Sequence, residues 1–266
     1  MIDTHAHIDG EEFAEDRDDV IARARRIGVK AVFVPAVGLS SIETVSATCA
    51  RYPGYAYPMA GLHPEEVTAD WHNDLATIRE SLGSGATGVG PYIAIGEVGL
   101  DYYWSRQYER EQREVFEEQV RWSVETRLPL MIHCRKAQND MVRILRRYES
   151  DLPGGVFHCF TGNAHEAREL LSFHGFALGI GGVLTFKKSN LPDTLAQAVP
   201  LDRIVLETDS PYMAPVPMRG QRNEPSFVSH VLCRLAQCYG VSADEVDRIT
   251  TETALSIFKL KVERQD

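Results

Sequence analysis

Short apolar runs alternate along the whole chain with longer segments in which apolar residues recur at helical spacing. The short runs are rich in β-branched and other apolar residues, which favours buried strands, and the longer segments favour amphipathic helices. We predict eight strands, at residues 1–8, 30–37, 55–61, 92–98, 128–133, 155–160, 176–180 and 203–208. We predict helices at residues 11–26, 40–51, 70–82, 106–126, 140–148, 164–173, 192–198, 226–239 and 243–258. Ser40 is the expected N-cap of the second helix, because Glu43 completes a capping box with it.

The regular alternation of strands and helices predicts an α/β fold with a parallel sheet. Eight strands, each followed by a helix, favour a sheet closed into a (β/α)8 TIM barrel, and a doubly wound open sheet is the competing topology. No Pro-, Gly- or Ser-rich linker and no internal repeat divides the 266 residues. We therefore expect one domain over residues 1–266.

Side chains with metal-ligand chemistry stand at five of the predicted strands. The first strand carries His5 and His7, which lie two residues apart and so share one face of a strand. At the carboxyl ends of four other strands the corresponding residues are Glu97, His133, His158 and Asp209. Barrel enzymes place their active sites at this end of the strands. Because imidazoles and carboxylates gathered there would repel or lack partners without a cation, they predict a centre for one or two divalent metals.

Four further features are candidates for contact with the substrate. His63 follows the third strand and is either a phosphate contact or proton donor, or a loop histidine. Arg135 follows a ligand histidine and is either a phosphate clamp or a surface arginine. Arg222 either lines the mouth and binds substrate or belongs to a rigid Pro-rich loop. The aromatic residues 102–104 either stack on nucleobases or pack within their loop.

The net charge of −10 changes what kind of nucleic-acid contact is expected. It disfavours sequence-independent adhesion through many Lys and Arg contacts, but it leaves room for an enzyme that holds a few phosphates through metal ions. Five cysteines without a disulfide-like spacing indicate reduced thiols, and no stretch approaches the ~18 apolar residues of a membrane span. The N-terminus has no signal-peptide pattern. We therefore expect a cytoplasmic monomer that does not enter the membrane.

Seven short motifs extend the pattern over nearly the whole chain. They are residues 3–7 (DTHAH), 61–64 (GLHP), 95–103 (IGEVGLDYY), 132–135 (IHCR), 158–162 (HCFTG), 207–211 (ETDSP) and 222–225 (RNEP). In these motifs the chain resembles the TatD family of metal-dependent deoxyribonucleases, within the amidohydrolase-like barrels. The resemblance implies one metal held by His5, His7, Glu97 and Asp209, and a second held by Glu97, His133 and His158. It also implies that His63 lies beside the substrate phosphate.

The resemblance implies phosphodiester hydrolysis in DNA, as a 3′–5′ exonuclease that uses a metal-bound hydroxide at a two-metal site. We expect Asp209 to act as the general base and His63 to assist the leaving side, on single-stranded DNA or DNA ends. The alternative is an amidohydrolase-type enzyme that cleaves a small amide, ester or aminoacyl-ester bond. Mg, Mn, Zn, Fe and Ni all remain open as the metals. Exonuclease action and cleavage at abasic sites remain open as well.

Overall fold

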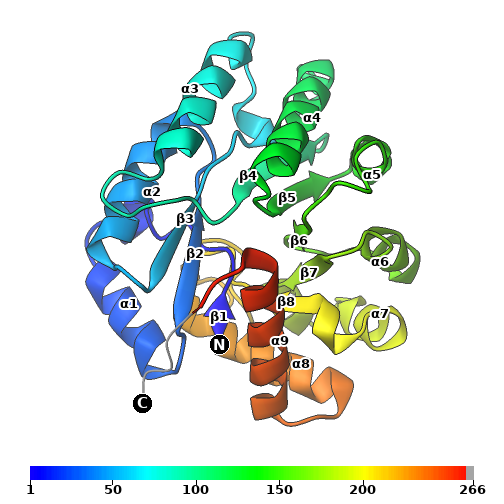
Figure 1. Ribbon diagram of the computed structural model, residues 1–266. Helices are drawn as coiled ribbons and strands as arrows, with labels where there is room; N and C mark the ends of the chain where they lie inside the picture. Colours follow the sequence, from blue (N-terminus) through cyan, green and yellow to red (C-terminus); the bar gives the residue numbers. More distant parts are fainter. Residues whose placement is uncertain (262–266) are drawn as a thin grey trace. The chain divides into compact units, whose positions relative to one another are not determined.

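The computed structural model describes residues 1–261, and the chain forms two compact units whose elements are labelled in Figure 1. The terminal unit consists of residues 1–34, 158–172 and the described residues from 176 onward, and the central unit consists of residues 35–157 and 173–175. Residues 262–266 of the expected domain lie outside the described residues. The expectation of a single domain stays a prediction.

The terminal unit contains parallel strands from both ends of the chain. These are β1 (Ile2–Asp3), β2 (Ala31–Pro35, whose last residue belongs to the central unit), β7 (Phe176–Ile180) and β8 (Ile204–Leu206). β1 pairs with β2, and β7 pairs with β8. The backbone N–H of Thr4 donates to the carbonyl of Leu206 at 3.0 Å, which joins β1 to β8. The spatial order in this unit is therefore β7, β8, β1, β2.

The helices of the terminal unit cover these strands. The α-helices are α1 (Arg17–Arg26), α6 (Ala164–Leu171), α7 (Leu191–Ala198), α8 (Val228–Tyr239) and α9 (Ala243–Phe258). The 3-10 turns are η1 (Glu11–Phe13), η3 (Gly182–Thr185), η4 (Leu201–Arg203) and η5 (Pro225–Phe227). α9 packs against β8 and β1, and the ring of Phe258 meets that of Phe33 on β2 with centroids 4.7 Å apart.

The central unit also has four parallel strands. These are β3 (Ala56–Met59), β4 (Ile95–Asp101), β5 (Leu130–Arg135) and β6 (Gly155–Phe157), in that spatial order. Its helices are α2 (Leu39–Arg51), η2 (Pro64–Glu66), α3 (Trp71–Ser84), α4 (Glu109–Thr126) and α5 (Gln138–Arg146). α4 packs against β4, and α5 packs against β4 and β5. Every residue of β4 is buried, as expected for a parallel strand covered on both faces.

The predicted α/β class, with eight parallel strands alternating with helices in (β/α)8 order, is confirmed. Among the described residues, no helix is both long enough and apolar enough to cross a membrane. Several predicted boundaries were wrong. The first strand ends at Asp3, and the fourth begins at Ile95 and continues to Asp101.

Two helix starts also differ from the prediction for identifiable reasons. The predicted helix at residues 11–26 is divided into η1 and α1, because Asp16 leaves the helical conformation and its carboxylate binds Arg222 at 2.7 and 2.8 Å. Ser40 is not an N-cap: α2 begins one residue earlier, at Leu39, with Gly38 as its N-cap. Ser41 then supplies the capping oxygen, which accepts the backbone N–H of Gly38 at 3.1 Å.

Candidate metal centre

Hydrogen bonds between the backbone just beyond β1 and the backbone just beyond β8 gather ligand-type side chains in the terminal unit. Ala6 forms a parallel bridge with Ser210, and the N–H of Asp209 donates to the carbonyl of His5 at 2.9 Å. The N–H of His7 donates to the carbonyl of Ser210 at 2.8 Å. These bonds bring the two histidines that share one face of the first strand beside the carboxylate predicted at the end of the eighth.

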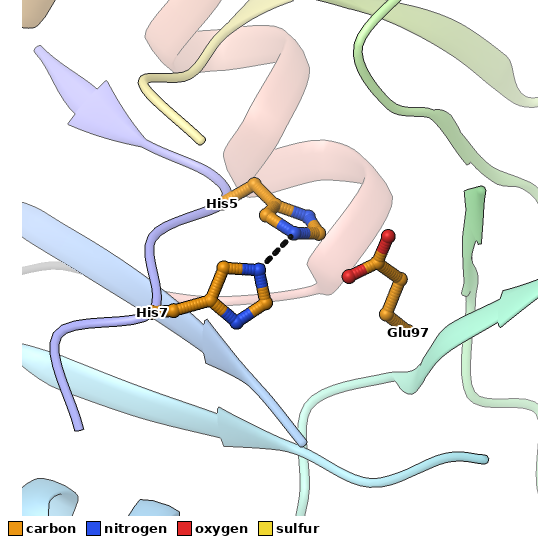
Figure 2. Close-up of side chains that lie close together, drawn as sticks. All are labelled: His5, His7 and Glu97. Atoms are coloured by element: carbon orange, nitrogen blue, oxygen red, sulfur yellow. Dashed lines mark hydrogen bonds between the residues drawn. The ribbon is translucent and has the colours of Figure 1, made fainter. Parts of the chain in front are cut away.

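The side chains in this part of the terminal unit have the geometry of a cation site. The Nε2 atoms of His5 and His7 face each other at 3.2 Å (Figure 2), and Oδ1 of Asp209 lies 3.8 Å from each. The ring of His158 stacks on that of His5 with centroids 4.0 Å apart. Ligand atoms of His5, His158 and Asp209 all lie within 4.8 Å of one another. Because imidazole nitrogens and a carboxylate oxygen are borderline and hard ligands, the set fits a divalent transition metal.

The backbone at Asp209 adopts a left-handed conformation, with φ of 55°. This conformation raises the free energy of a residue other than glycine, and residues held in it concentrate at functional sites. A fully buried side chain holds the loop in place: Nδ2 of Asn223 donates to the carbonyls of Thr208 at 2.7 Å and Tyr212 at 2.6 Å, on both sides of Asp209. The sequence motif contained Asn223, but nothing in its spacing indicated this bracing role.

Glu207 braces the neighbouring histidine from inside the terminal unit. The side chain is fully buried, and Oε1 accepts the N–H of Cys159 at 2.5 Å and lies 3.7 Å from Nδ1 of His158. A Cβ atom at Gly179 would lie only 2.1 Å from Oε2 of Glu207. Glycine at position 179 therefore leaves the space in which the buried carboxylate of Glu207 sits beside His158.

The central unit contains a second cluster, formed by His63, Glu97 and His133. The pairing of β4 with β5 shifts in register between Ile95 and Val98, and Glu97 lies in this irregular segment. Such irregularities are common next to active sites, where they change the direction of a side chain. Oε1 of Glu97 lies 3.1 Å from Nδ1 of His133 and 3.4 Å from Nε2 of His63. The ligand atoms of all three residues lie within 4.8 Å of one another, and those of Glu97 and His133 are suited to a divalent cation.

The hydrogen-bond partners of the two rings assign their tautomers. Nδ1 of His63 accepts the N–H of Glu65 at 3.2 Å, so its proton lies on Nε2, toward Glu97. Nε2 of His133 lies 2.9 Å from Oδ2 of Asp101. Burial alone would raise the pKa of Asp101, but hydrogen bonds from His133 and from backbone N–H groups hold that pKa below its ordinary value. The ionised carboxylate keeps the proton of His133 on Nε2 and leaves the lone pair of Nδ1 facing Glu97.

Three buried polar residues that support the central cluster were missed from the sequence. Asp101 belongs to the motif of residues 95–103 but lies beyond the predicted end of the fourth strand at residue 98, so its burial was not expected. Gln112 and Gln119 lie two turns apart on the buried face of α4. Oε1 of Gln112 accepts the N–H of Asp101 at 3.0 Å, and Gln119 bonds both the N–H and the carbonyl of Leu62 at 2.7 and 3.1 Å.

The two predicted substrate-binding arginines occupy different surroundings. The guanidinium of Arg222 binds both carboxylate oxygens of Asp16 and lies over the ring of Phe13 at 4.5 Å, contacts that favour a structural role. Arg135 is exposed at the end of β5, and its Cζ lies 3.7 Å from the ring centroid of Tyr103. Substrate binding by either residue stays a prediction.

Parallel strands with histidines and carboxylates at their carboxyl ends define the class of metal-dependent hydrolases built on α/β barrels. The sequence model of the family described as TatD related DNase matches residues 2–259. The chain therefore belongs to the TatD family, and by family it is a metal-dependent hydrolase that acts on ester bonds.

Individual relatives match over almost their entire length. The Bacillus subtilis (strain 168) protein named uncharacterized metal-dependent hydrolase YabD is 36% identical over 260 residues, covering 98% of this chain and 99% of that protein. The Cronobacter sakazakii protein named 3'-5' ssDNA/RNA exonuclease TatD is 35% identical over 263 residues, covering 97% of each. The crystal structure of YJJV, a TatD homologue from Escherichia coli K12, superposes with a TM-score of 0.88 at 28% identity and covers 98% of each chain.

Proposed function

We propose that this chain is a 3′–5′ exonuclease that hydrolyses phosphodiester bonds in single-stranded DNA with two divalent metal ions. The observation that carries the proposal is the convergence of His5, His7 and Asp209 on one point of the terminal unit. The named activity of the Cronobacter sakazakii relative supports the direction of cleavage and the single-stranded substrate. Action as a monomer in the cytoplasm belongs to the same proposal.

The residues that would hold the metals are those that the resemblance to the family implies, and all of them offer imidazole or carboxylate ligands. His5, His7, Glu97 and Asp209 would hold one ion, and Glu97, His133 and His158 would hold the other. Mg, Mn, Zn, Fe and Ni are all compatible with such ligands, and the imidazoles favour the transition metals among them. When bound, the ions would make a nearby water more acidic and offset the negative charge that develops on the phosphate.

Asp209 is the proposed general base. Its side chain is 16% exposed, so a water molecule can reach it, and its backbone is fixed by the bond to His5 and by the bonds of Asn223 on either side. The carboxylate would take the proton of the water that attacks phosphorus. Holding the carboxylate in one position lowers the entropic cost of bringing base and water together.

His63 is the proposed proton donor to the leaving group. Because the N–H of Glu65 occupies Nδ1, the neutral ring carries its proton on Nε2, the nitrogen that points into the central cluster. That N–H would bind a phosphate oxygen or protonate the departing 3′ oxygen of the shortened strand. His63 is mostly buried, which limits competition from bulk water for the same proton.

Metal analysis followed by an end-specific nuclease assay tests the proposal. Protein stripped with a chelator should lose activity on a 5′-labelled single-stranded oligodeoxynucleotide and regain it when metal is added back. Products should shorten progressively from the 3′ end, and a 3′-blocked oligonucleotide should resist cleavage. A panel of small amides and esters separates the amidohydrolase alternative. Full nuclease activity in protein shown to lack metal would refute the metal mechanism, and cleavage of the amides without cleavage of DNA would refute the nuclease.

A further inference from the structure

Two large aromatic side chains stand out from the loop that follows β4. Tyr103 is 51% exposed and Trp104 is 66% exposed, the largest exposed fraction among the exposed large hydrophobic residues of the described chain. Their backbone is nevertheless fixed, because Oδ1 of Asp101 accepts the N–H of Tyr103 at 2.7 Å and that of Trp104 at 3.4 Å. The two rings meet edge to face with centroids 4.9 Å apart, and this contact still leaves more than half of each residue exposed. Tyr102, by contrast, is partly buried and donates its hydroxyl to Asp140 at 3.0 Å.

Arg135 lies beside the two exposed rings. The β4–β5 register places Asp101 opposite Arg135, and the N–H of Tyr102 donates to the Arg135 carbonyl at 2.9 Å. The guanidinium of Arg135 stacks on Tyr103, with Cζ 3.7 Å from its centroid, and lies 5.2 Å from the centroid of Trp104. A stacked guanidinium keeps its N–H groups at the edge of the plane, where they can bind an oxyanion.

No carboxylate of residues 1–261 pairs with the guanidinium of Arg135, whereas the two nearby arginines each have a carboxylate partner. Arg106, on the same loop as Trp104, is paired with Glu109 at 2.6 Å. Arg113, on α4, is paired with Glu109 and Asp140. Arg135 makes no ion pair with any carboxylate of residues 1–261. In a chain with a net charge of −10, an exposed cation without a carboxylate partner beside two exposed rings is suited to a ligand that is both anionic and aromatic.

We propose that Tyr103, Trp104 and Arg135 form a subsite for one unpaired nucleotide of a single-stranded nucleic acid. The base stacks on Trp104, and a phosphate oxygen of the same strand binds the guanidinium of Arg135. Every base has a π face, so the subsite recognises the single-stranded state and not the sequence. The proposal rests on the proposed function and adds to it where the strand lies next to the central cluster.

The position of the subsite relative to the chemistry follows from one shared residue. Asp101 holds the aromatic loop through Oδ1 and binds the ligand histidine His133 through Oδ2 at 2.9 Å. The loop and the ligand are therefore fixed to the same carboxylate, within the same unit. A base stacked on Trp104 would hold its strand against the central cluster, and a duplex end would have to unpair to reach it.

Binding measured without cleavage tests the subsite separately from the reaction. Chelator-treated protein is titrated with a five-nucleotide thymidine oligonucleotide and with an oligonucleotide of the same length made only of abasic units, so that both carry the same phosphates. Tryptophan fluorescence and calorimetry report the two dissociation constants. The unmodified protein should bind the base-bearing strand more tightly, and Trp104→Ala should weaken that binding about tenfold while leaving abasic binding unchanged. Trp104→Phe should restore part of the difference.

Trp71→Ala is the matched control, because Trp71 is a partly exposed tryptophan of the same unit that stacks on His72 of α3. It should leave both dissociation constants unchanged. Equal binding of the two oligonucleotides by the unmodified protein, or a base preference that survives Trp104→Ala, would overturn the subsite. Failure of metal-dependent cleavage in the separate nuclease assay would overturn the proposed function, while a base preference that depends on Trp104 would still support the subsite.

Discussion

Replacing Asp101 by asparagine should move a proton across the ring of His133 and weaken metal binding in the central unit. The carboxylate accepts the N–H of Tyr103 through Oδ1 at 2.7 Å and the Nε2–H of His133 through Oδ2 at 2.9 Å. The amide oxygen of asparagine must stay toward Tyr103, because an NH2 group there would face a donor. The NH2 group then faces His133 and donates to Nε2. The ring proton must move to Nδ1, which lies 3.1 Å from Glu97, and a protonated nitrogen has no lone pair for a metal.

The size of the effect follows from the bond that is lost. A hydrogen bond to a buried, charged group contributes about 1.5–3 kcal/mol. At about 1.4 kcal/mol for each factor of ten, metal affinity should fall about 10- to 100-fold. Asp101→Ala removes the acceptor without imposing the wrong tautomer on His133. The alanine variant should therefore retain more metal affinity than the asparagine variant, although asparagine conserves the shape.

Competition against a chromophoric chelator measures the metal affinity, and nitrogen NMR of the imidazole rings shows which nitrogen carries the proton. Asp140→Asn is the matched control, since Asp140 accepts from the hydroxyl of Tyr102 in the same unit and is absent from the clusters of potential metal ligands. An Asp101→Asn variant with parental metal affinity, or with the His133 proton still on Nε2, would refute this account of the central cluster.

Four further outcomes are expected. Asp209→Asn should lower single-turnover cleavage by ~10²-fold or more with substrate binding little changed, and parental turnover in the metal-loaded variant would assign the base elsewhere. His158→Ala should lose bound metal, measured by elemental analysis, while circular dichroism stays parental; a variant that keeps its metal would contradict the ligand role. Gly99→Ala should lower the free energy of unfolding in urea by about 3 kcal/mol, because its Cβ would lie 1.8 Å from the carbonyl oxygen of His133 at a φ of +147°, and parental stability would contradict that clash. With a net charge of −10, log affinity for DNA should fall with log salt at a slope magnitude below ~3, whereas a slope beyond ~6 would reveal an unrecognised basic groove.

The candidate ligands could be predicted because their chemistry interrupts apolar runs. His133 directly follows the apolar run at residues 128–132, and Asp209 follows the run at residues 204–206 by three positions, where a polar residue has few structural reasons to be. The strand and helix types followed from periodicity over eight to twenty residues, and most of them are confirmed. The boundaries were predicted less accurately. The start of β4, for example, is set by its pairing with β5 and not by local propensity.

The supporting residues could not be predicted because their partners are backbone groups far along the chain. Gln119 satisfies Leu62 across 57 positions, and the amide of Asn223 satisfies Thr208 and Tyr212 across a loop. A buried glutamine on a charged helix looks like a solvated residue until the helix phase is known. The segment from Glu109 to Arg121 does carry ion pairs on its outer face, but Gln112 and Gln119 are buried and bond the backbone of Asp101 and Leu62.

The strained backbone positions explain why local sequence preference fails at the ends of these strands. Asp209, Cys159 and Lys136 all have positive φ, between 49° and 59°, and each stands at the predicted end of a ligand-bearing strand or within three residues after its ligand. Each such conformation costs about 1–3 kcal/mol for a residue other than glycine, so surrounding bonds must impose it. At Asp209 the bond to His5 and the two bonds of Asn223 do so, and at Cys159 the carboxylate of Glu207 accepts the backbone N–H. Buried polar side chains thus hold the chain in turns that its own residues disfavour, and those turns position the candidate metal ligands.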